Sequence, residues 1–108
     1  MTSSRLKRNA PLLKYLARAK PKVAKAIIKV ADRDLIQTLC ECSLNILKGH
    51  VRLNSQQKRK LRAHKHALRA LAAKKTSHKR RQRLLQKGGL LPALLAPALG
   101  FFAKLFLQ

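Results

Sequence analysis

Positive charge limits what this chain can fold into, because the chain carries very little negative charge to balance it. The 108 residues include 26 Lys and Arg but only three Asp and Glu, which leaves a net charge of +23. All three acids, Asp32, Asp34 and Glu41, lie within ten residues of one another. A compact chain of this composition repels itself unless anions from outside neutralise it. We therefore expect nucleic acid as the main partner, with an anionic membrane or an acidic protein as the alternatives.

The composition of the chain changes abruptly at Gly88-Gly89. Residues 49–89 carry fourteen Lys and Arg and no Asp or Glu, whereas residues 90–108 carry one charged side chain, Lys104. A dense cation followed by an apolar segment indicates two kinds of partner, a polyanion and something apolar. The predicted divisions are a flexible basic arm (1–9), a helical unit (10–48), a highly basic helical region (49–89) and an apolar tail (90–108).

Apolar residues recur at helical spacing along most of the chain, and no stretch alternates as a strand does. The predicted fold is all-α, a small bundle of three to five short helices followed by the apolar tail. Pro11 and Pro21 fit the first turns of two helices. Asp32 fits the N-cap of a third helix, which Gly49 would end.

The basic region is expected to form one long helix and one short helix. Asn54 followed by Gln57 fits a capping box, and helical spacing then continues to about Lys75. Thr76-Ser77 offers a break and a new N-cap for the short helix, which ends at Gly88-Gly89. Pro97 would kink any helix that the tail forms.

The basic region carries the strongest functional signal. Lys and Arg that neutralise phosphates release counterions, so the affinity of such a region for nucleic acid falls steeply with salt. The region has no Phe, Tyr or Trp for base stacking, and nothing in it marks a base-reading helix, so we expect non-specific binding to the phosphate backbone. The alternatives are a charged surface that contacts only water, or a disordered polycation. The predicted phosphate contacts are Lys58, Arg59, Lys60, Arg62, Lys65, Arg69, Lys74, Lys75, Lys79, Arg80, Arg81 and Arg83.

The apolar tail allows three interpretations. As a straight helix, residues 90–107 would span roughly 27 Å, close to the ~30 Å hydrocarbon core of a bilayer, but two Pro, a Gly and a Lys argue against a clean span. The tail could instead lie at a membrane interface, pack on its own helices or another protein, or stay disordered. The residues expected to contact a membrane or partner are Leu94, Leu95, Phe101, Phe102, Leu105 and Phe106.

The sequence shows no arrangement of residues that is typical of a catalytic or metal-binding site. Cys40 and Cys42 would lie about 200° apart on a helix, and the four His are scattered among cations that repel a metal ion. There is no paired carboxylate, no glycine-rich phosphate loop and no nucleophile with an adjacent base. We therefore predict a non-enzyme without metal or cofactor, whose two cysteines are reduced and buried.

The chain resembles a family of small basic proteins encoded by Maverick/Polinton elements and adintoviruses. The resemblance runs from about Arg8 to Leu105, through PLLKYLARAKPKVAKAIIK, DLIQTLCECSLNILKG, QKRKLRAHKHALRALAAKK and LLQKGGLLPALLAPALG. It implies a virus-like element with a double-stranded DNA genome, capsid proteins and an adenovirus-type cysteine protease. The layout is also similar to that of the adenovirus core-protein precursor mu, which joins an Arg-rich DNA-condensing segment to an apolar C-terminal part.

Together these features predict a structural protein that binds and condenses double-stranded DNA in the core of a virus-like particle. The resemblance implies a location in the virion, and in the host nucleus during assembly. The tail would contact capsid protein or membrane, and self-association would hide it. The protease makes Gly88-Gly89 a candidate cleavage site, although Gln86 stands where such proteases favour an apolar residue.

Two other functions remain open at this point. The main alternative is a membrane-active or membrane-anchored basic protein that acts through residues 90–108, with its basic helices on anionic headgroups. A ribosomal or RNA-chaperone protein is the third, and the apolar tail fits it poorly.

Overall fold

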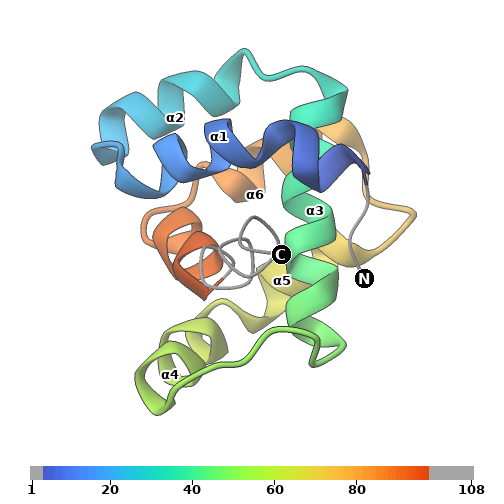
Figure 1. The fold of residues 1–108 in the computed structure, drawn as a ribbon. Helices are drawn as coiled ribbons and strands as arrows, with labels where there is room; N and C mark the ends of the chain where they lie inside the picture. Colours follow the sequence, from blue (N-terminus) through green and yellow to red (C-terminus); the bar gives the residue numbers. More distant parts are fainter. Residues whose placement is uncertain (1–3, 98–108) are drawn as a thin grey trace.

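The computed structural model describes residues 4–97, and within that range the protein is all-helical, with no strand. The described range contains seven short helices, so the predicted three to five is too low. Six carry labels in Figure 1, and the seventh spans residues 90–97. The labelled helices are α1 (Ser4–Arg18), α2 (Pro21–Lys29), α3 (Arg33–Leu47), α4 (Ser55–Ala63), α5 (Lys65–Ala72) and α6 (His78–Leu85).

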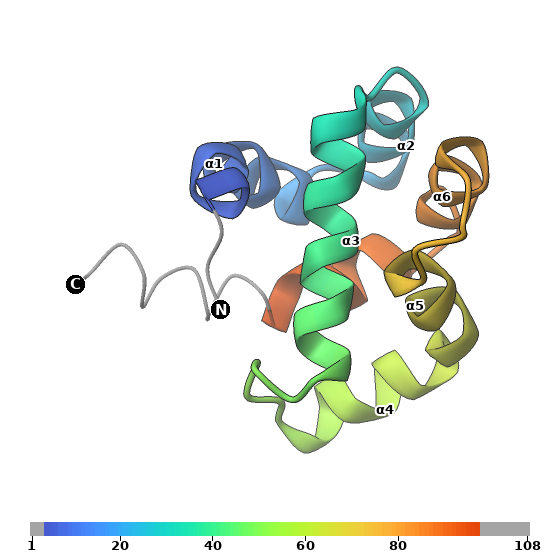
Figure 2. The same ribbon diagram turned by 90° about the vertical axis from the view of Figure 1, so that its right-hand side faces the viewer.

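Helix α3 is the centre of the fold, and the other helices pack around it (Figures 1 and 2). It contacts α1, α5 and α6, and its contact with α5 is the most extensive. Its start is fixed as predicted, because the side chain of Asp32 accepts a hydrogen bond from the backbone of Leu35 at 2.9 Å. Gly49 follows its end with φ of 78°, a conformation that favours glycine. The residues that α3 buries lie on more than one of its faces: Leu35, Ile36, Thr38, Leu39, Cys40, Cys42, Ser43 and Ile46.

Helix α1 begins at Ser4, so the expected flexible basic arm is wrong for residues 4–9. Because the helix starts this early, Leu6 and Ala10 are buried in the core, and their burial stabilises the N-terminal turns. Pro11 consequently lies inside α1 and not in its first turn. Its ring is on the exposed side of the helix. Because proline has no N–H, the carbonyl four residues earlier lacks its helical donor, and water can reach that carbonyl instead.

Asp34 holds α1 against α3. Arg8 pairs with its carboxylate at 2.8 Å, Arg5 pairs with it at 3.2 Å, and the amide of Asn9 donates to it at 2.9 Å. Arg5 also pairs with Glu41 at 2.9 Å. The hydrogen bond from Asn9, followed by that from Arg8, lowers the pKa of Asp34 below its ordinary value. The α1–α3 interface therefore uses two of the three acids of the chain.

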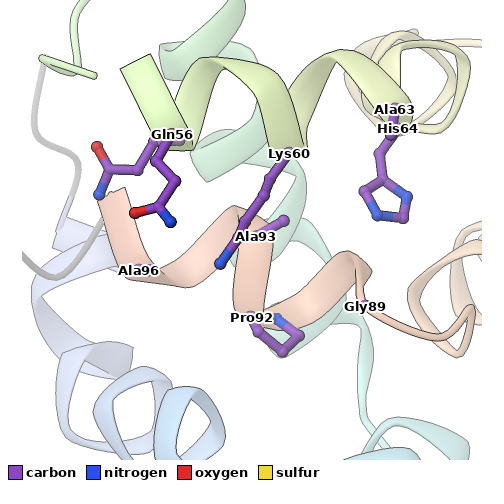
Figure 3. Close-up of a pocket in the computed structure, with 9 residues that line it drawn as sticks. Gln56, Lys60, Ala63, His64, Gly89, Pro92, Ala93 and Ala96 are labelled. Carbon is purple, nitrogen blue, oxygen red and sulfur yellow. The ribbon is translucent and has the colours of Figure 1, made fainter. Parts of the chain in front are cut away.

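The long helix predicted from Asn54 to about Lys75 is wrong, because the chain breaks at His64, where φ is −110° and ψ is 20°. Beyond the break, α5 runs along α3, and the hydroxyl of Ser43 donates a buried hydrogen bond to the carbonyl of Leu68 at 2.8 Å. Before the break, α4 crosses the helix of residues 90–97 (Figure 3). The break lets the two halves pack against different parts of the core.

Other local predictions are confirmed. Asn54 and Gln57 form the capping box, with hydrogen bonds of 2.8 and 3.0 Å between each backbone N–H and the other side chain. Ser77 accepts a hydrogen bond from the backbone of Arg80 at 3.2 Å and caps α6. Helix α2 begins at Pro21, as the sequence indicates. Each signal depends only on neighbouring residues, which is why the sequence reveals it.

The first part of the apolar tail belongs to the core. Residues 90–97 form a helix between α2 and α4, and Leu94 and Leu95 are fully buried, with 0% of their surface exposed. These two leucines, expected at a membrane or partner, therefore pack on the protein's own helices in this structure. The other four expected contacts, Phe101, Phe102, Leu105 and Phe106, lie outside the described residues. Within residues 4–97, no helix has the length and apolar character needed to cross a bilayer.

Removing the side chain of Leu94 should destabilise the protein. We expect Leu94→Ala to lower the free energy of unfolding by about 2–5 kcal/mol, because it leaves a cavity in the core. Leu12→Ala is the matched control, since Leu12 is 36% exposed and its truncation should cost less than about 1 kcal/mol. Denaturant unfolding followed by circular dichroism measures both. Equal, small effects would contradict the burial of residues 90–97.

Acid should weaken the α1–α3 contact through Asp34. Because the folded pKa of Asp34 is lowered, its contribution is complete above the unfolded value of about 4 and is lost as pH falls through the folded value. We expect the stability of Asp34→Asn, measured by denaturant unfolding at a series of pH values, to fall less steeply on acidification than that of the unmodified protein. Asp32→Asn keeps the N-cap acceptor and should retain the steep fall. Identical acid profiles for all three proteins would exclude this role.

Candidate nucleic-acid interface

Helices α4, α5 and α6 lie on the side of α3 away from α1. In Figure 2, α1 lies to the left of α3, α5 and α6 lie to its right, and α4 lies below them. Eleven of the twelve predicted phosphate contacts are exposed on these helices and on the link between α5 and α6. We call this set the basic face: Lys58, Arg59, Lys60, Arg62, Lys65, Arg69, Lys74, Lys75, Lys79, Arg80 and Arg83.

The basic face is exposed because its helices are anchored along narrow apolar seams. Leu61 is the one buried residue of α4, and Leu85 is the one buried residue of α6. Helix α5 buries Ala67, Leu68 and Leu71. The remaining sides of these helices point away from the core and are covered with Lys and Arg. The fold therefore exposes the charges of three consecutive helices.

Among residues 4–97, no carboxylate forms an ion pair with the basic face. The sequence has no Asp or Glu after Glu41. Within residues 4–97, the ion pairs join Arg5 and Arg8 to Asp34 and Glu41, all between α1 and α3. The exposed cations of α4, α5 and α6 consequently have no ion-pair partner within residues 4–97, and their fields add to a positive potential over these helices.

Arg81 is the exception among the predicted phosphate contacts. It is half-buried, and its guanidinium donates a hydrogen bond to the carbonyl of Ala73 at 2.8 Å, which ties α6 to the end of α5. Its Nε is buried and has no hydrogen-bond partner. Arg81 is thus a structural residue in this fold, placed differently from the exposed Arg80 beside it.

Gln82 is a second anchor of α6, and the sequence analysis missed it. Its amide donates to the carbonyl of Ile28 at 3.1 Å, near the end of α2. Helical spacing could have identified both anchors, because Arg81 and Gln82 precede the buried Leu85 by four and three residues and therefore share its face. Residue type alone does not distinguish Arg81 from the exposed arginines around it, so the spacing to Leu85 is the signal.

The two cysteines are buried, as expected, and do not form a reactive site. Burial raises the pKa of Cys40 to about 11 and the pKa of Cys42 to about 12, so both thiols are protonated at neutral pH. Among residues 4–97, no three His, Cys, Asp or Glu side chains come together in a way that could hold a metal ion. Nothing in this part of the chain suggests a cofactor site.

Gly88 and Gly89 form an exposed turn between α6 and the helix of residues 90–97. Gly89 has φ of 83°, and a Cβ there would lie 3.6 Å from the ring of His64. The turn is accessible to a protease, so the cleavage prediction stays open. A cut there would leave the following helix held in the core by its buried leucines, and would not by itself free it.

A hollow of about 440 Å³ separates α4 from the helix of residues 90–97 (Figure 3). Lys60 extends from α4 across it toward Ala93. One wall is polar and the other is apolar with small side chains, and no acid lines it. This lining offers no catalytic arrangement. It consists of Gln56, Gln57, Lys60, Ala63, His64, Gly89, Pro92, Ala93 and Ala96.

Comparison of the chain with models of known protein families, with curated proteins and with solved structures gave no match. The interpretation of the basic face therefore depends on its residues and geometry.

Proposed function

We propose that this chain is a structural protein that binds and condenses double-stranded DNA through its basic face. One observation carries the proposal: eleven exposed cations lie on three consecutive helices and the link between the last two, in a region that contains no acid. A nucleic-acid backbone supplies the matching array of negative charge. Contacts to single phosphates are individually modest, and together they dominate affinity.

Duplex DNA suits the basic face better than single-stranded nucleic acid does. Readers of single strands stack bases on aromatic side chains, and the basic region contains no Phe, Tyr or Trp. Helix α4 has cations at four of its nine positions and buries one residue, so its charges point in several directions. A helix of this kind fits the major groove of B-DNA, about 12 Å wide, with phosphates on both sides. Binding of this type carries little sequence information.

The size and charge of the protein also match those of a DNA segment. The folded molecule measures 34 × 29 × 28 Å. A 34 Å length of duplex carries about 20 phosphates, because one negative charge occurs per about 1.7 Å of helix axis. The net charge of the whole chain, +23, is of similar size and opposite sign, so copies bound side by side carry enough charge to neutralise the duplex. Neutralised duplexes no longer repel one another, which supports condensation as the outcome of binding.

The resemblance to proteins of Maverick/Polinton elements and adintoviruses supplies a biological setting for this activity. In that setting, the chain is a core protein of a virus-like particle and its DNA is the packaged genome. Residues 98–108 are the part of the apolar tail that remains for a capsid protein, a membrane or a second copy. A membrane-active role for the whole of residues 90–108 would require the helix of residues 90–97 to leave the core, where Leu90 and Leu94 are fully buried, and we therefore favour DNA.

Replacing cations of the basic face should reduce the salt dependence of DNA binding. We expect Lys58→Gln, Lys60→Gln, Lys65→Gln and Lys74→Gln together to make the slope of log K against log salt less negative by about three to four, because each lost phosphate contact contributes about 0.9. Fluorescence anisotropy with short duplexes of two unrelated sequences, at several salt concentrations, measures this slope. The unmodified protein should bind both sequences equally.

The matched control removes the same charge from α1 and α2. It combines Lys7→Gln, Lys20→Gln, Lys22→Gln and Lys29→Gln, all exposed positions outside the basic face. We expect the control to change the slope by less than about one. If both variants change the slope equally, DNA binding depends on the net charge of the chain and the basic face is not the interface. Failure of the unmodified protein to bind duplex DNA at low salt would exclude the proposed function.

A further inference from the structure

A second hollow, of about 320 Å³, lies between the end of α1, the start of α2 and residues 85–92. We call it the α2 pocket. It shares Gly89 and Pro92 with the hollow in Figure 3 but is bordered by α1 and α2 where that hollow is bordered by α4. Its volume falls at the lower end of the range for small-molecule sites. It is lined by Leu16, Ala19, Pro21, Lys22, Ala24, Lys25, Leu85, Gln86, Lys87, Gly88, Gly89, Leu91 and Pro92.

The α2 pocket has an apolar floor. Leu16, Ala24, Leu85 and Leu91 line it and are buried members of the hydrophobic core. They come from α1, α2, α6 and the helix of residues 90–97, so the floor is a seam where four helices meet. An apolar group that covers this seam removes hydrocarbon surface from water, which favours binding.

The rim of the α2 pocket is cationic. Lys22 and Lys25 are exposed and lie three residues apart on α2, and therefore on neighbouring turns of one face. Lys87 lines the pocket from the other side, and no Asp or Glu lines it. Gly88 and Gly89 also border it, and within residues 4–97 their backbone amides donate no hydrogen bond. Three ammonium groups and two amide donors can thus meet one anionic group.

We propose that the α2 pocket binds a free fatty acid, with the acyl chain against the apolar floor and the carboxylate among Lys22, Lys25 and Lys87. The arrangement of the α2 pocket, with an apolar floor and a cationic rim, selects this ligand. A phosphate of DNA would find its charge partners only at the rim and would leave the floor uncovered. A lipid in a bilayer keeps its acyl chains in the membrane and presents its charged headgroup to the protein. A site for that headgroup would need a cationic floor, whereas the floor of the α2 pocket is apolar. The proposal does not depend on DNA binding.

Nuclear magnetic resonance of the full, uniformly ¹⁵N-labelled chain, titrated with sodium decanoate below its micelle-forming concentration, tests the proposal. Decanoate should produce saturable shifts in a local set of amides. Butyrate has the same charge and a short chain, so it should produce no saturable shift there. Equal responses to both anions, or shifts spread over α4, α5 and α6, would overturn the proposal. The expected reporters are Ala19, Ala24, Gly88, Gly89 and Leu91.

Two matched variants test the cationic rim. Lys22→Gln with Lys25→Gln should weaken decanoate binding about fivefold, because two ion pairs to the carboxylate are lost. Lys29→Gln with Lys48→Gln removes the same charge at exposed positions that do not line the pocket, and should change affinity less than about twofold. All four sites are exposed, so both variants should fold, and the same spectra check this. Equal affinities in the two variants would contradict the assigned headgroup site.

Two further measurements separate a free fatty acid from the other ligands. Ala19→Leu should abolish the saturable shifts by filling the pocket while leaving the rest of the spectrum unchanged. Vesicles containing phosphatidylglycerol should bind the two lysine variants equally, since a membrane senses overall charge. If vesicles select against Lys22→Gln with Lys25→Gln and decanoate produces no local shifts, the site is one for membrane headgroups and the proposal is wrong.

Discussion

Asp34 accepts hydrogen bonds from Arg8 and Asn9 and pairs with Arg5, and these contacts hold α1 against α3. Glu41 adds a second partner for Arg5, and Asp32 caps α3, so the chain uses all three of its acids on this side. The cations of the basic face have no Asp or Glu near them in sequence, and among residues 4–97 none of them forms an ion pair. An anion that binds there and not to the unfolded chain also stabilises the fold, so binding and stability are linked.

The apolar segment and the basic region are parts of one fold. Helices α4 and α6 each bury a single residue, Leu61 and Leu85, which join the same hydrophobic core as the leucines of residues 90–97. That core extends from Leu6 to Leu95 and draws on all seven described helices. Residues 90–97 therefore help to complete the core on which the basic helices rest. A charged surface this dense needs such an anchor, because its own helices supply little apolar area.

Sequence reasoning succeeded where structure depends on neighbouring residues and failed where it depends on distant ones. The caps at Asp32, Asn54 and Ser77 are local, and each was predictable. The helical conformation of residues 4–9 depends on ion pairs from Arg5 to Asp34 and Glu41, which lie 29 and 36 residues away in the chain. The break at His64 has no glycine or proline to signal it and follows from packing. The exposure of most of the predicted phosphate contacts follows from the narrow apolar seams of their helices, whereas Arg81 is half-buried because it lies four residues before the buried Leu85.

A lysine footprint of the DNA complex tests most directly whether the basic face is the interface. Acetylation of exposed lysines, with and without duplex DNA, is followed by mass spectrometry of the peptides. The account predicts strong protection of Lys58, Lys60, Lys65, Lys74, Lys75 and Lys79, and little change at Lys7, Lys20 and Lys29, which lie on α1, on α2 and between them. Uniform protection along the chain, or protection confined to α1 and α2, would contradict it.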